Sequence, residues 1–235
     1  VWLARSNSDA KLHTVWNGLP LPPPPIRTDA GHDRGSLDLV TIGRLAPEKR
    51  IGDIVEAIAR LNRTTPCTLT IFGEGPLRDA IAEQITQLGL NERIQLAGNV
   101  SHDQVMARLG NADVLIHAAD SEPFGLAMIE AMACGLPVVA TRSSGAQEIV
   151  DHGVTGFLSP CADVDALVSS TLKLAEDPAL RRRMGDAGRE RAERLFSLEA
   201  HMIAMEKVWT EAIEVHRSKG SAINTNHATC ARDVP

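Results

Sequence analysis

Aromatic residues are scarce in this sequence: they make up 3% of its 235 residues, and tyrosine is absent. Proteins that hold single-stranded nucleic acid by stacking its bases need more aromatic side chains than this. The formal net charge of −6 also excludes a broad basic surface that would attract nucleic acid or an anionic membrane. Any phosphate chemistry must therefore depend on a few local cations.

Cysteine is sparse as well. The four cysteines, Cys67, Cys134, Cys161 and Cys230, lie far apart, and no pair has the Cys-x-x-Cys spacing of a zinc or redox site. We expect buried thiols, with one further thiol in the tail, in a reducing cytosol. The eight histidines show no metal-ligand spacing either.

Long hydrophobic runs are missing too. No apolar stretch approaches the length of a membrane span, and the chain opens at Val1 without a signal-peptide pattern. The 43% of hydrophobic and 23% of charged residues are typical of a globular protein that buries a core. We therefore expect a cytoplasmic protein, and the first residue indicates a fragment or a processed piece.

Strand-like and helix-like segments alternate from residue 37 onward. Short apolar runs predict strands at Leu37–Ile42, Thr68–Phe72, Ile94–Ala97, Val114–His117 and Val138–Thr141, with short elements around Glu148 and at Gly156–Leu158. Helical spacing and stop signals predict helices at 51–61, Leu77–Leu88, 101–109, Leu126–Ala133, Val164–Ala175, Ala179–Leu195 and Leu198–Val215. This order predicts an α/β fold with a parallel sheet covered on both faces and ligands at the carboxyl ends of the strands.

Composition divides the chain into three segments. Residues 1–36 are predicted to be an interdomain remnant and linker, because Asn17-Gly18 is a turn signal and Pro22–Pro25 is a stiff extended spacer. Residues 37–216 carry the alternating pattern and form the predicted domain. Residues 217–235 are polar, and we expect a disordered tail.

The loop that follows the first predicted strand, Gly43 to Arg50, contains the cations Arg44, Lys49 and Arg50. The planar fork of arginine and the compact charge of lysine both suit phosphate oxygens, and a helix N-terminus directly follows. A solvated turn with surface cations is the alternative, and it is the favoured one when this loop is considered alone.

Two glutamates flank a Pro-Phe-Gly-Leu element. Glu122 lies in a loop and Glu130 lies in the first two turns of the next helix, so both carboxylates can face the volume at that helix N-terminus. A carboxylate accepts two hydroxyl hydrogen bonds at once, which suits the diols of ribose or hexose, and the amides of 124–127 suit phosphates. The alternative is that these acids only offset the helix dipole. For Glu130 alone the two interpretations are equally favoured, whereas the pair of glutamates favours a ligand.

Together these motifs resemble a known family. Gly-Arg-Leu-x-Pro-Glu-Lys at 43–49 and Glu-Pro-Phe-Gly-Leu-x-x-x-Glu-Ala at 122–131 look like the large retaining glycosyltransferase family (family 4, glycosyl transferases group 1) that includes sucrose synthases and mannosyltransferases. Supporting pieces stand in the family's order at Asn17-Gly18, Gly73–Pro76, Cys134–Thr141, Gly145 with Glu148–Val150, and Gly156–Leu158. The resemblance covers residues 17–215.

The resemblance implies the second, donor-binding half of a GT-B architecture, in which two Rossmann-like domains face a cleft. It implies transfer of a hexose from a nucleoside-diphosphate sugar, such as a UDP or GDP sugar, to a carbohydrate or lipid-linked acceptor, with retention of configuration and without metal or cofactor. The acceptor domain would then be the missing partner, and any attachment to a membrane would go through it. Without that domain, the helix at Leu198–Val215 would leave an apolar patch with Trp209 exposed, open to self-association.

The same resemblance assigns roles to residues. Arg44 and Lys49 would hold the diphosphate and stabilise the leaving phosphate, Glu122 would contact sugar hydroxyls, and Glu130 would hold the ribose. The catalytic set is Arg44, Lys49 and Glu122. The remaining donor contacts would come from Gly43, Gly98, Asn99, Val100, Phe124, Gly125 and Leu126.

The sequence departs from the family pattern at three places: Arg50 stands where glycine is frequent, Ala118-Ala119 where Pro-Ser is common, and Ser144-Gly145 where Gly-Gly is common. A nucleotide-sugar-binding module without catalysis remains an alternative, because binding and catalysis share the same residues. Another GT-B enzyme, such as a sugar-nucleotide epimerase, is a third interpretation, against which the Pro-Phe-Gly-Leu element argues.

Four further signals have simpler interpretations. The acids of 163–165 have a metal-binding spacing but precede a helix, where they are expected to act as caps. Gly73-x-Gly75 lacks the third glycine of a dinucleotide motif. His117 is expected to be a structural histidine with satisfied hydrogen bonds rather than a catalytic one, and Arg181–Arg183 is expected to form a solvated helix face.

Overall fold

The computed structural model describes residues 13–23 and 35–227, and the side chains up to residue 217. The chain divides into two compact units. One comprises Leu21–Glu193, and the other joins Val1–Pro20 to Arg194–Pro235. The predicted linker of 1–36 is described only in part, so it stays a prediction. The larger unit contains the sheet and every residue predicted to bind the donor.

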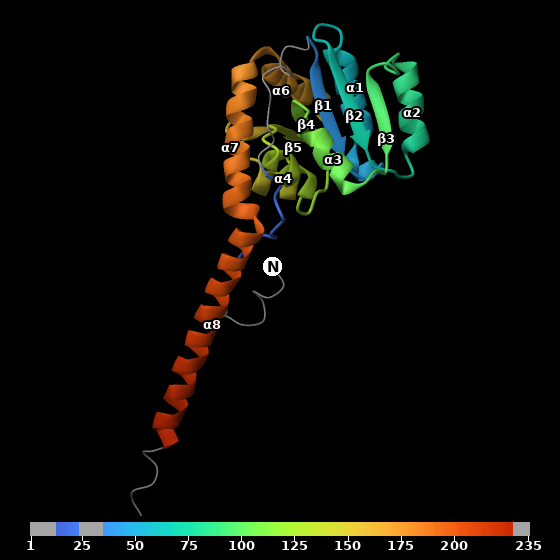
Figure 1. Cartoon of the computed structure of the whole chain (residues 1–235). Coiled ribbons are helices and arrows are strands. Elements are labelled where there is room, and N and C mark those ends of the chain that lie inside the picture. Colours follow the sequence, from blue (N-terminus) through green and yellow to red (C-terminus); the bar gives the residue numbers. More distant parts are fainter. Residues whose placement is uncertain (1–12, 24–34, 228–235) are drawn as a thin grey trace, which may run out of the picture. The chain divides into compact units, whose positions relative to one another are not determined.

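The larger unit is built on a six-stranded parallel sheet with the order β3-β2-β1-β4-β5-β6 (Figure 1). Its strands are β1 Leu37–Ile42, β2 Cys67–Phe72, β3 Ile94–Gly98, β4 Val114–His117, β5 Val138–Thr141 and β6 Gly156–Ser159. Connections leave β1 toward β2 and leave β4 toward β5, so the chain changes direction between β1 and β4. In open parallel sheets this switch point, at the carboxyl ends of the strands, is where ligands bind. The predicted α/β fold is confirmed.

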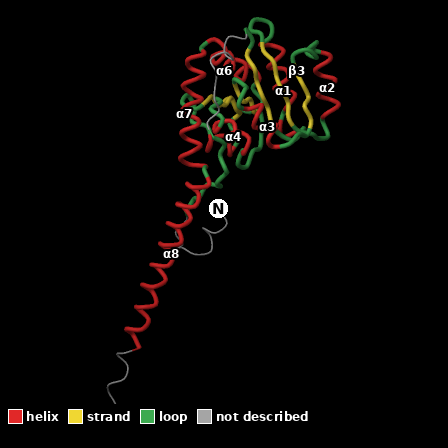
Figure 2. Tube along the Cα trace, viewed as in Figure 1, coloured by secondary structure: helices red, strands yellow, loops and turns green. Residues whose placement is uncertain are grey.

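Helices cover both faces of the sheet, and Figure 2 draws them in red around the yellow strands. In one layer, α1 Ile51–Leu61 contacts α2 Arg78–Gln87 and α6 Val164–Glu176. In the other layer, α4 Leu126–Ala133 contacts α3 His102–Leu109 and α5 Ser144–Ile149. The apolar spacing predicted for α1 buries Ile51, Ile54, Ile58 and Leu61 at 0–3% exposure. Strands β4 and β5 are buried throughout, as expected for apolar runs covered on both faces.

Helix ends confirm some sequence signals. The Ser101 hydroxyl accepts from the Gln104 amide, and the Gln104 side chain accepts from the Ser101 amide, which forms a capping box at α3. The Asp163 carboxylate accepts from the Ala166 amide at 2.8 Å at the start of α6. The capping interpretation of this acid is therefore confirmed.

The interpretation of Arg181–Arg183 as a solvated face is wrong for its first residue. Arg181 lies on α7 Pro178–Phe196 and is only 5% exposed. Its Nε lies 3.5 Å from an Asp113 carboxylate oxygen, and it donates to the Leu174 carbonyl at the end of α6. A charge on the inner side of the helix is thus paired, which a run of arginines in a sequence does not indicate.

The cysteine prediction holds only in part. Cys67 and Cys134 are buried, and burial raises the pKa of the Cys67 thiol to about 12. Cys161 is exposed, because it lies in the turn that follows β6 rather than in an element of the core. Cys230 lies outside the described residues.

The smaller unit contains α8 Leu198–His227 and the described segment up to Pro20. The Trp16 ring packs edge-on against Phe196, and the Trp16 carbonyl lies 2.7 Å from the His201 ring. Trp209 is 59% exposed, as the predicted apolar patch requires. The other exposed large apolar side chains of α8 are Leu198, Met202, Ile203, Ile213 and Val215.

Helix α8 continues to His227, although disorder was predicted from residue 217. No proline interrupts the sequence between the start of α8 and residue 227, and extending an existing helix costs less than nucleating one. Residues 228–235 lie outside the described part of the chain. None of the helices described here has the length and apolar character needed to cross a membrane.

Candidate functional site

The loops that follow β1 and β4 meet at the switch point of the sheet. The first loop contains the short 3-10 helix η3 Pro47–Lys49. The Asp120 amide donates to the Glu48 carbonyl at 2.9 Å, which joins the two loops through their backbones. Arg50 adds a second link, because its guanidinium donates to Asp53 at 2.7 Å and to Asp120 at 3.2 Å.

Arg50 adopts an unusual backbone conformation. Its φ of 48° and ψ of 40° lie in the left-handed region, which glycine adopts without steric cost. This explains why glycine suits the position. Here an arginine occupies it, and the two ion pairs hold its side chain in place.

Three side chains from separate elements converge beside this junction. The Lys49 ammonium donates to a carboxylate oxygen of Glu122, Oε2, at 2.6 Å. The Nε2 atom of His117, at the end of β4, lies 3.4 Å from the same oxygen. The other carboxylate oxygen, Oε1, accepts from the Phe124 amide at 3.4 Å. Glu122 therefore accepts from two donors, Lys49 and the Phe124 amide, and lies beside the His117 ring, with its side chain only 13% exposed.

This environment keeps Glu122 ionised. The neighbouring His117 ring contributes most and Lys49 adds to it, so that the pKa of Glu122 falls to about 2 although burial raises it. The carboxylate is thus an acceptor over the whole physiological pH range. It is suited to accept hydrogen bonds from hydroxyl groups and not to donate a proton.

Two glycines shape the loop that carries Glu122. Gly125 begins α4 with a φ of 91°, and a Cβ there would lie 2.2 Å from a Met128 methyl carbon. The Gly145 amide donates to the Glu122 carbonyl at 2.7 Å, and a Cβ at Gly145 would lie 2.6 Å from that oxygen. The close approach of α5 therefore fixes the backbone of the loop. The first amides of α4 lie next to this loop, where they are suited to an anion.

Glu130 lies in the second turn of α4 with its side chain 19% exposed. Burial raises the pKa of Glu130, and the His102 ring, whose Nδ1 lies 3.8 Å from a carboxylate oxygen, opposes this effect. His102 is the first residue of α3. The two helices thus place an acid and a titratable base opposite each other.

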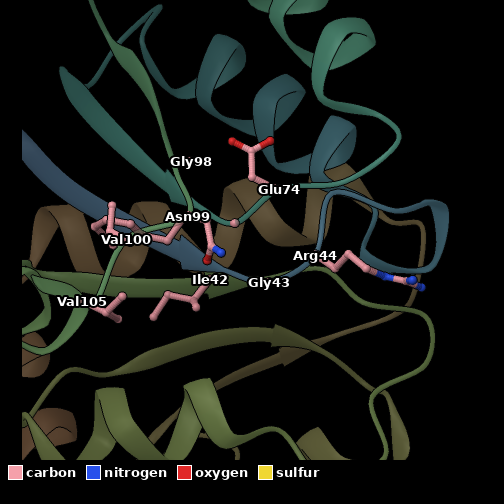
Figure 3. Close-up of a pocket in the computed structure, with 10 residues that line it drawn as sticks. Ile42, Gly43, Arg44, Glu74, Gly98, Asn99, Val100 and Val105 are labelled. Carbon is pink, nitrogen blue, oxygen red and sulfur yellow. The ribbon is translucent and has the colours of Figure 1, made fainter. Parts of the chain in front are cut away.

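A hollow of about 360 Å³ opens at the carboxyl ends of β1, β2 and β3 (Figure 3). Its lining residues are Ile42, Gly43, Arg44, Phe72, Gly73, Glu74, Gly98, Asn99, Val100 and Val105. Gly98 has a φ of 70°, and a Cβ there would lie 2.8 Å from the Glu74 carboxylate. The hollow thus combines apolar walls with exposed backbone, which suits a flat heterocycle.

Arg44 points away from the Asn99, Val100 and Val105 side of this hollow in Figure 3. Its guanidinium pairs with Glu48 at 2.6 Å, and its side chain is 67% exposed. This contact lowers the pKa of Glu48. An exposed ion pair of this kind is weak and exchanges readily with a ligand.

The structure therefore joins Lys49 to Glu122, puts Glu130 on the helix that follows Glu122, and places Gly43, Gly98, Asn99 and Val100 around one hollow. Among the described residues, the Arg44 guanidinium pairs with Glu48 and not with Lys49 or Glu122.

Sequence reasoning did not identify the contacts of His117, His102, Glu74 and Arg50 in this region. Their only signal was position, since each lies in or beside a loop or helix start at the carboxyl edge of the sheet. Among the described residues, no three His, Cys, Asp or Glu side chains gather as a possible metal site.

Comparisons with known proteins identify the family of this chain. Residues 24–191 match the family model described as glycosyl transferases group 1. The chain is 34% identical over 179 residues to a glycogen synthase of Mycobacterium tuberculosis, covering 76% of this chain and 43% of the relative. It is 28% identical over 188 residues to the N-acetyl-alpha-D-glucosaminyl L-malate synthase of Bacillus anthracis, covering 80% of this chain and 49% of that protein.

Solved structures show the same fold. A sucrose-phosphate synthase of Thermosynechococcus elongatus is 31% identical with a TM-score of 0.66, over 76% of this chain and 46% of that one. HepE of Anabaena, solved in complex with UDP, is 25% identical with a TM-score of 0.69, over 79% of this chain and 54% of that one. The chain thus spans about half the length of these relatives. It belongs to the glycosyl transferases group 1 family.

Proposed function

We propose that this chain binds the donor of a retaining glycosyltransferase, a nucleoside-diphosphate hexose, at the carboxyl edge of its sheet. The observation that carries the proposal is the contact of Lys49 with Glu122 at 2.6 Å, which puts a cation suited to phosphate and an acid suited to hydroxyl groups beside the start of α4. The hollow at β1–β3 gives room for the base, and the partly buried carboxylate of Glu130, on the helix that follows Glu122, is suited to hold the ribose.

In this proposal each group acts on a part of the donor. Lys49 and the first amides of α4 stabilise negative charge as the phosphate leaves the sugar. Arg44 exchanges Glu48 for a phosphate oxygen, since its present contact is exposed. Glu122 accepts hydrogen bonds from sugar hydroxyls, because its oxygens already face donors and its pKa of about 2 excludes a role as acid.

We further propose that the acceptor hydroxyl is held by a second domain. The relatives from Mycobacterium tuberculosis and Bacillus anthracis are about twice as long as the part matched here. Catalysis needs both substrates held in reacting geometry. The expected result is donor binding by this chain without efficient transfer, and full turnover by the chain alone would contradict this part of the proposal.

Titration calorimetry with UDP, GDP and ADP, in the presence of a chelator, tests the donor site. HepE of Anabaena was solved with UDP, and a mannosyltransferase of Mycolicibacterium smegmatis that is 35% identical over 159 residues is named as GDP-mannose-dependent, so both bases are candidates. One nucleotide should bind, and Glu130→Ala should weaken it at least tenfold. Glu190→Ala, an exposed acid on α7, is the matched control and should bind as the unmodified chain does.

A folded chain that binds none of the three nucleotides would refute the donor-site proposal. Equal weakening by Glu130→Ala and Glu190→Ala would show that the substitution acts through general charge and not through the ribose. Loss of binding only when the chelator is added would contradict the metal-free donor site.

A further inference from the structure

His117 is a buried polar residue in an otherwise apolar strand. Its neighbours along β4 are Val114, Leu115 and Ile116, and its partner across the sheet is Ala140 on β5. The residue is only 4% exposed, and its Nε2 atom makes no well-oriented hydrogen bond to any described residue. Leaving a buried nitrogen without such a bond is unfavourable, so an apolar residue would serve a purely structural role better.

The unsatisfied nitrogen faces the donor site. It lies 3.4 Å from Oε2 of Glu122, the same oxygen that accepts from Lys49 at 2.6 Å. One carboxylate oxygen therefore has two nitrogen neighbours, of which Lys49 is the nearer. His117 stays next to the same oxygen when Lys49 moves away.

The proposed function, on which this inference rests, changes that balance. When a diphosphate binds, the Lys49 ammonium turns to the phosphate oxygens and weakens its contact with Glu122. The carboxylate side chain is only 13% exposed, so water replaces the lost cation poorly. Glu122 then needs another positive neighbour.

Four charged groups in the loops at this edge of the sheet are already paired. Asp120 and Arg50 pair with each other, and Arg44 pairs with Glu48. Among the described residues, the charged side chains recorded against His117 are Glu122 from the β4–α4 loop and, through that carboxylate, Lys49 from η3. The cross-strand neighbour Ala140 carries no charge.

We propose that His117 replaces Lys49 as the counter-ion of Glu122 when the donor diphosphate binds, and that it does so by taking up one proton from solvent. The ring then carries a hydrogen on both nitrogens, and its Nε2–H donates to Oε2 of Glu122. This exchange frees Lys49 for the phosphate without leaving the acid unpaired. His117 is thus a positioning residue that couples phosphate binding to the orientation of the sugar-binding acid.

The exchange makes donor binding depend on pH in a defined direction. Binding takes up a proton, so affinity is favoured at low pH and falls as the pH rises. Glu122 stays ionised throughout, because the His117 ring is the larger cause of its low pKa and still faces it when Lys49 turns to the phosphate. A nucleotide sugar is the appropriate probe, because its diphosphate is esterified at both ends and carries no group that titrates near neutral pH.

Calorimetric titration of the whole chain tests the exchange. UDP-glucose, GDP-mannose and ADP-glucose are each titrated at pH 7 in phosphate, imidazole and Tris buffers, whose ionisation enthalpies differ. The slope of the binding enthalpy against the buffer enthalpy gives the number of protons taken up. We expect uptake of a substantial fraction of one proton, and a slope near zero in His117→Gln, which keeps a hydrogen-bond donor but cannot bind the proton.

Two further variants assign the proton. His102→Gln tests the other histidine of the site, which faces Glu130, and should keep most of the proton uptake. His216→Gln, an exposed position on α8, should keep all of it. Loss of proton uptake in His102→Gln with its retention in His117→Gln would overturn the assignment.

The other outcomes separate this inference from the proposed function. Tight binding of a nucleotide sugar without proton uptake would overturn the exchange and leave the donor site standing, whereas a folded chain that binds none of the probes would refute both. If His117→Gln does not fold, the pH profile of the unmodified chain decides: affinity should fall about fivefold or more between pH 6 and pH 8. A flat profile would overturn the exchange.

Discussion

Replacement of Arg50 by glycine and by alanine separates the backbone strain at this position from its ion pairs. Both variants remove the guanidinium and with it the contacts to Asp53 and Asp120. Only glycine also removes the steric cost of the left-handed conformation, in which Arg50 has a φ of 48°. The difference between the two variants therefore measures the backbone alone.

The structure sets the expected magnitudes. The two ion pairs are partly exposed, with the Arg50 side chain at 30% and the Asp120 side chain at 43%, so each contributes about 0.5 kcal/mol. Alanine should then lower the free energy of unfolding by about 1 kcal/mol. The left-handed conformation costs about 1–2 kcal/mol, of which the greater freedom of glycine in the unfolded chain cancels about 0.5–1 kcal/mol. The free energy of unfolding of Arg50→Gly should thus be about 0.5–1 kcal/mol higher than that of Arg50→Ala.

Urea unfolding followed by circular dichroism measures both variants against the unmodified chain. The Arg50→Gly midpoint should lie close to that of the unmodified chain, and the Arg50→Ala midpoint should be clearly lower. An alanine variant as stable as the glycine variant would refute the strain. A glycine variant that is destabilised by several kcal/mol would show that the pairs with Asp53 and Asp120 are far stronger than their exposure indicates.

Three further predictions concern the site and the loops around it. Lys49→Met should weaken nucleoside diphosphate binding by about tenfold to a hundredfold in calorimetry, because a charge-assisted hydrogen bond contributes about 1.5–3 kcal/mol; an unchanged affinity would contradict the phosphate role. Because burial raises the pKa of Glu130, acid should weaken donor binding at a higher pH than it would for an ordinary carboxyl group. Glu130→Gln should lower affinity at neutral pH and remove this loss on acidification, while the opposite pH dependence assigned to His117 remains. Gly73→Ala should destabilise the fold by about 3 kcal/mol or more in urea unfolding, since its Cβ would lie 2.0 Å from the Gly43 carbonyl oxygen, whereas Gly89→Ala, with a φ of 68° but open space around it, should cost only about 1 kcal/mol; equal losses would show that the close approach at Gly73 relaxes.

The sheet could be predicted from the sequence because its strands are short apolar runs bounded by turn residues. Strands Val114–His117 and Val138–Thr141 agree with the prediction at both ends, since both are short, mostly apolar runs that are buried on two faces. Helix ends were less certain. Helix α8 runs to His227 although its sequence becomes polar near residue 217.

The candidate site could be predicted only as a list of residues. Lys49 and Glu122 are recognisable from motifs 73 positions apart, and the structure joins them in one hydrogen bond. The sequence did not reveal which neighbours contact Lys49 and Glu122, because these contacts depend on packing. In the sequence alone, His117 is typical of a structural histidine and Arg50 of an additional cation in the loop. Arg181 shows the same limit, since its burial follows from the side of α7 that faces α6.

A crystal structure of the chain with the nucleotide that binds in calorimetry tests the central claim most directly. We expect the diphosphate within hydrogen-bond distance of Lys49 and of the first amides of α4, the ribose on Glu130, and the base in the hollow beside Gly98. A nucleotide bound away from the carboxyl edge of the sheet, with Lys49 unmoved on Glu122, would refute the donor-site proposal.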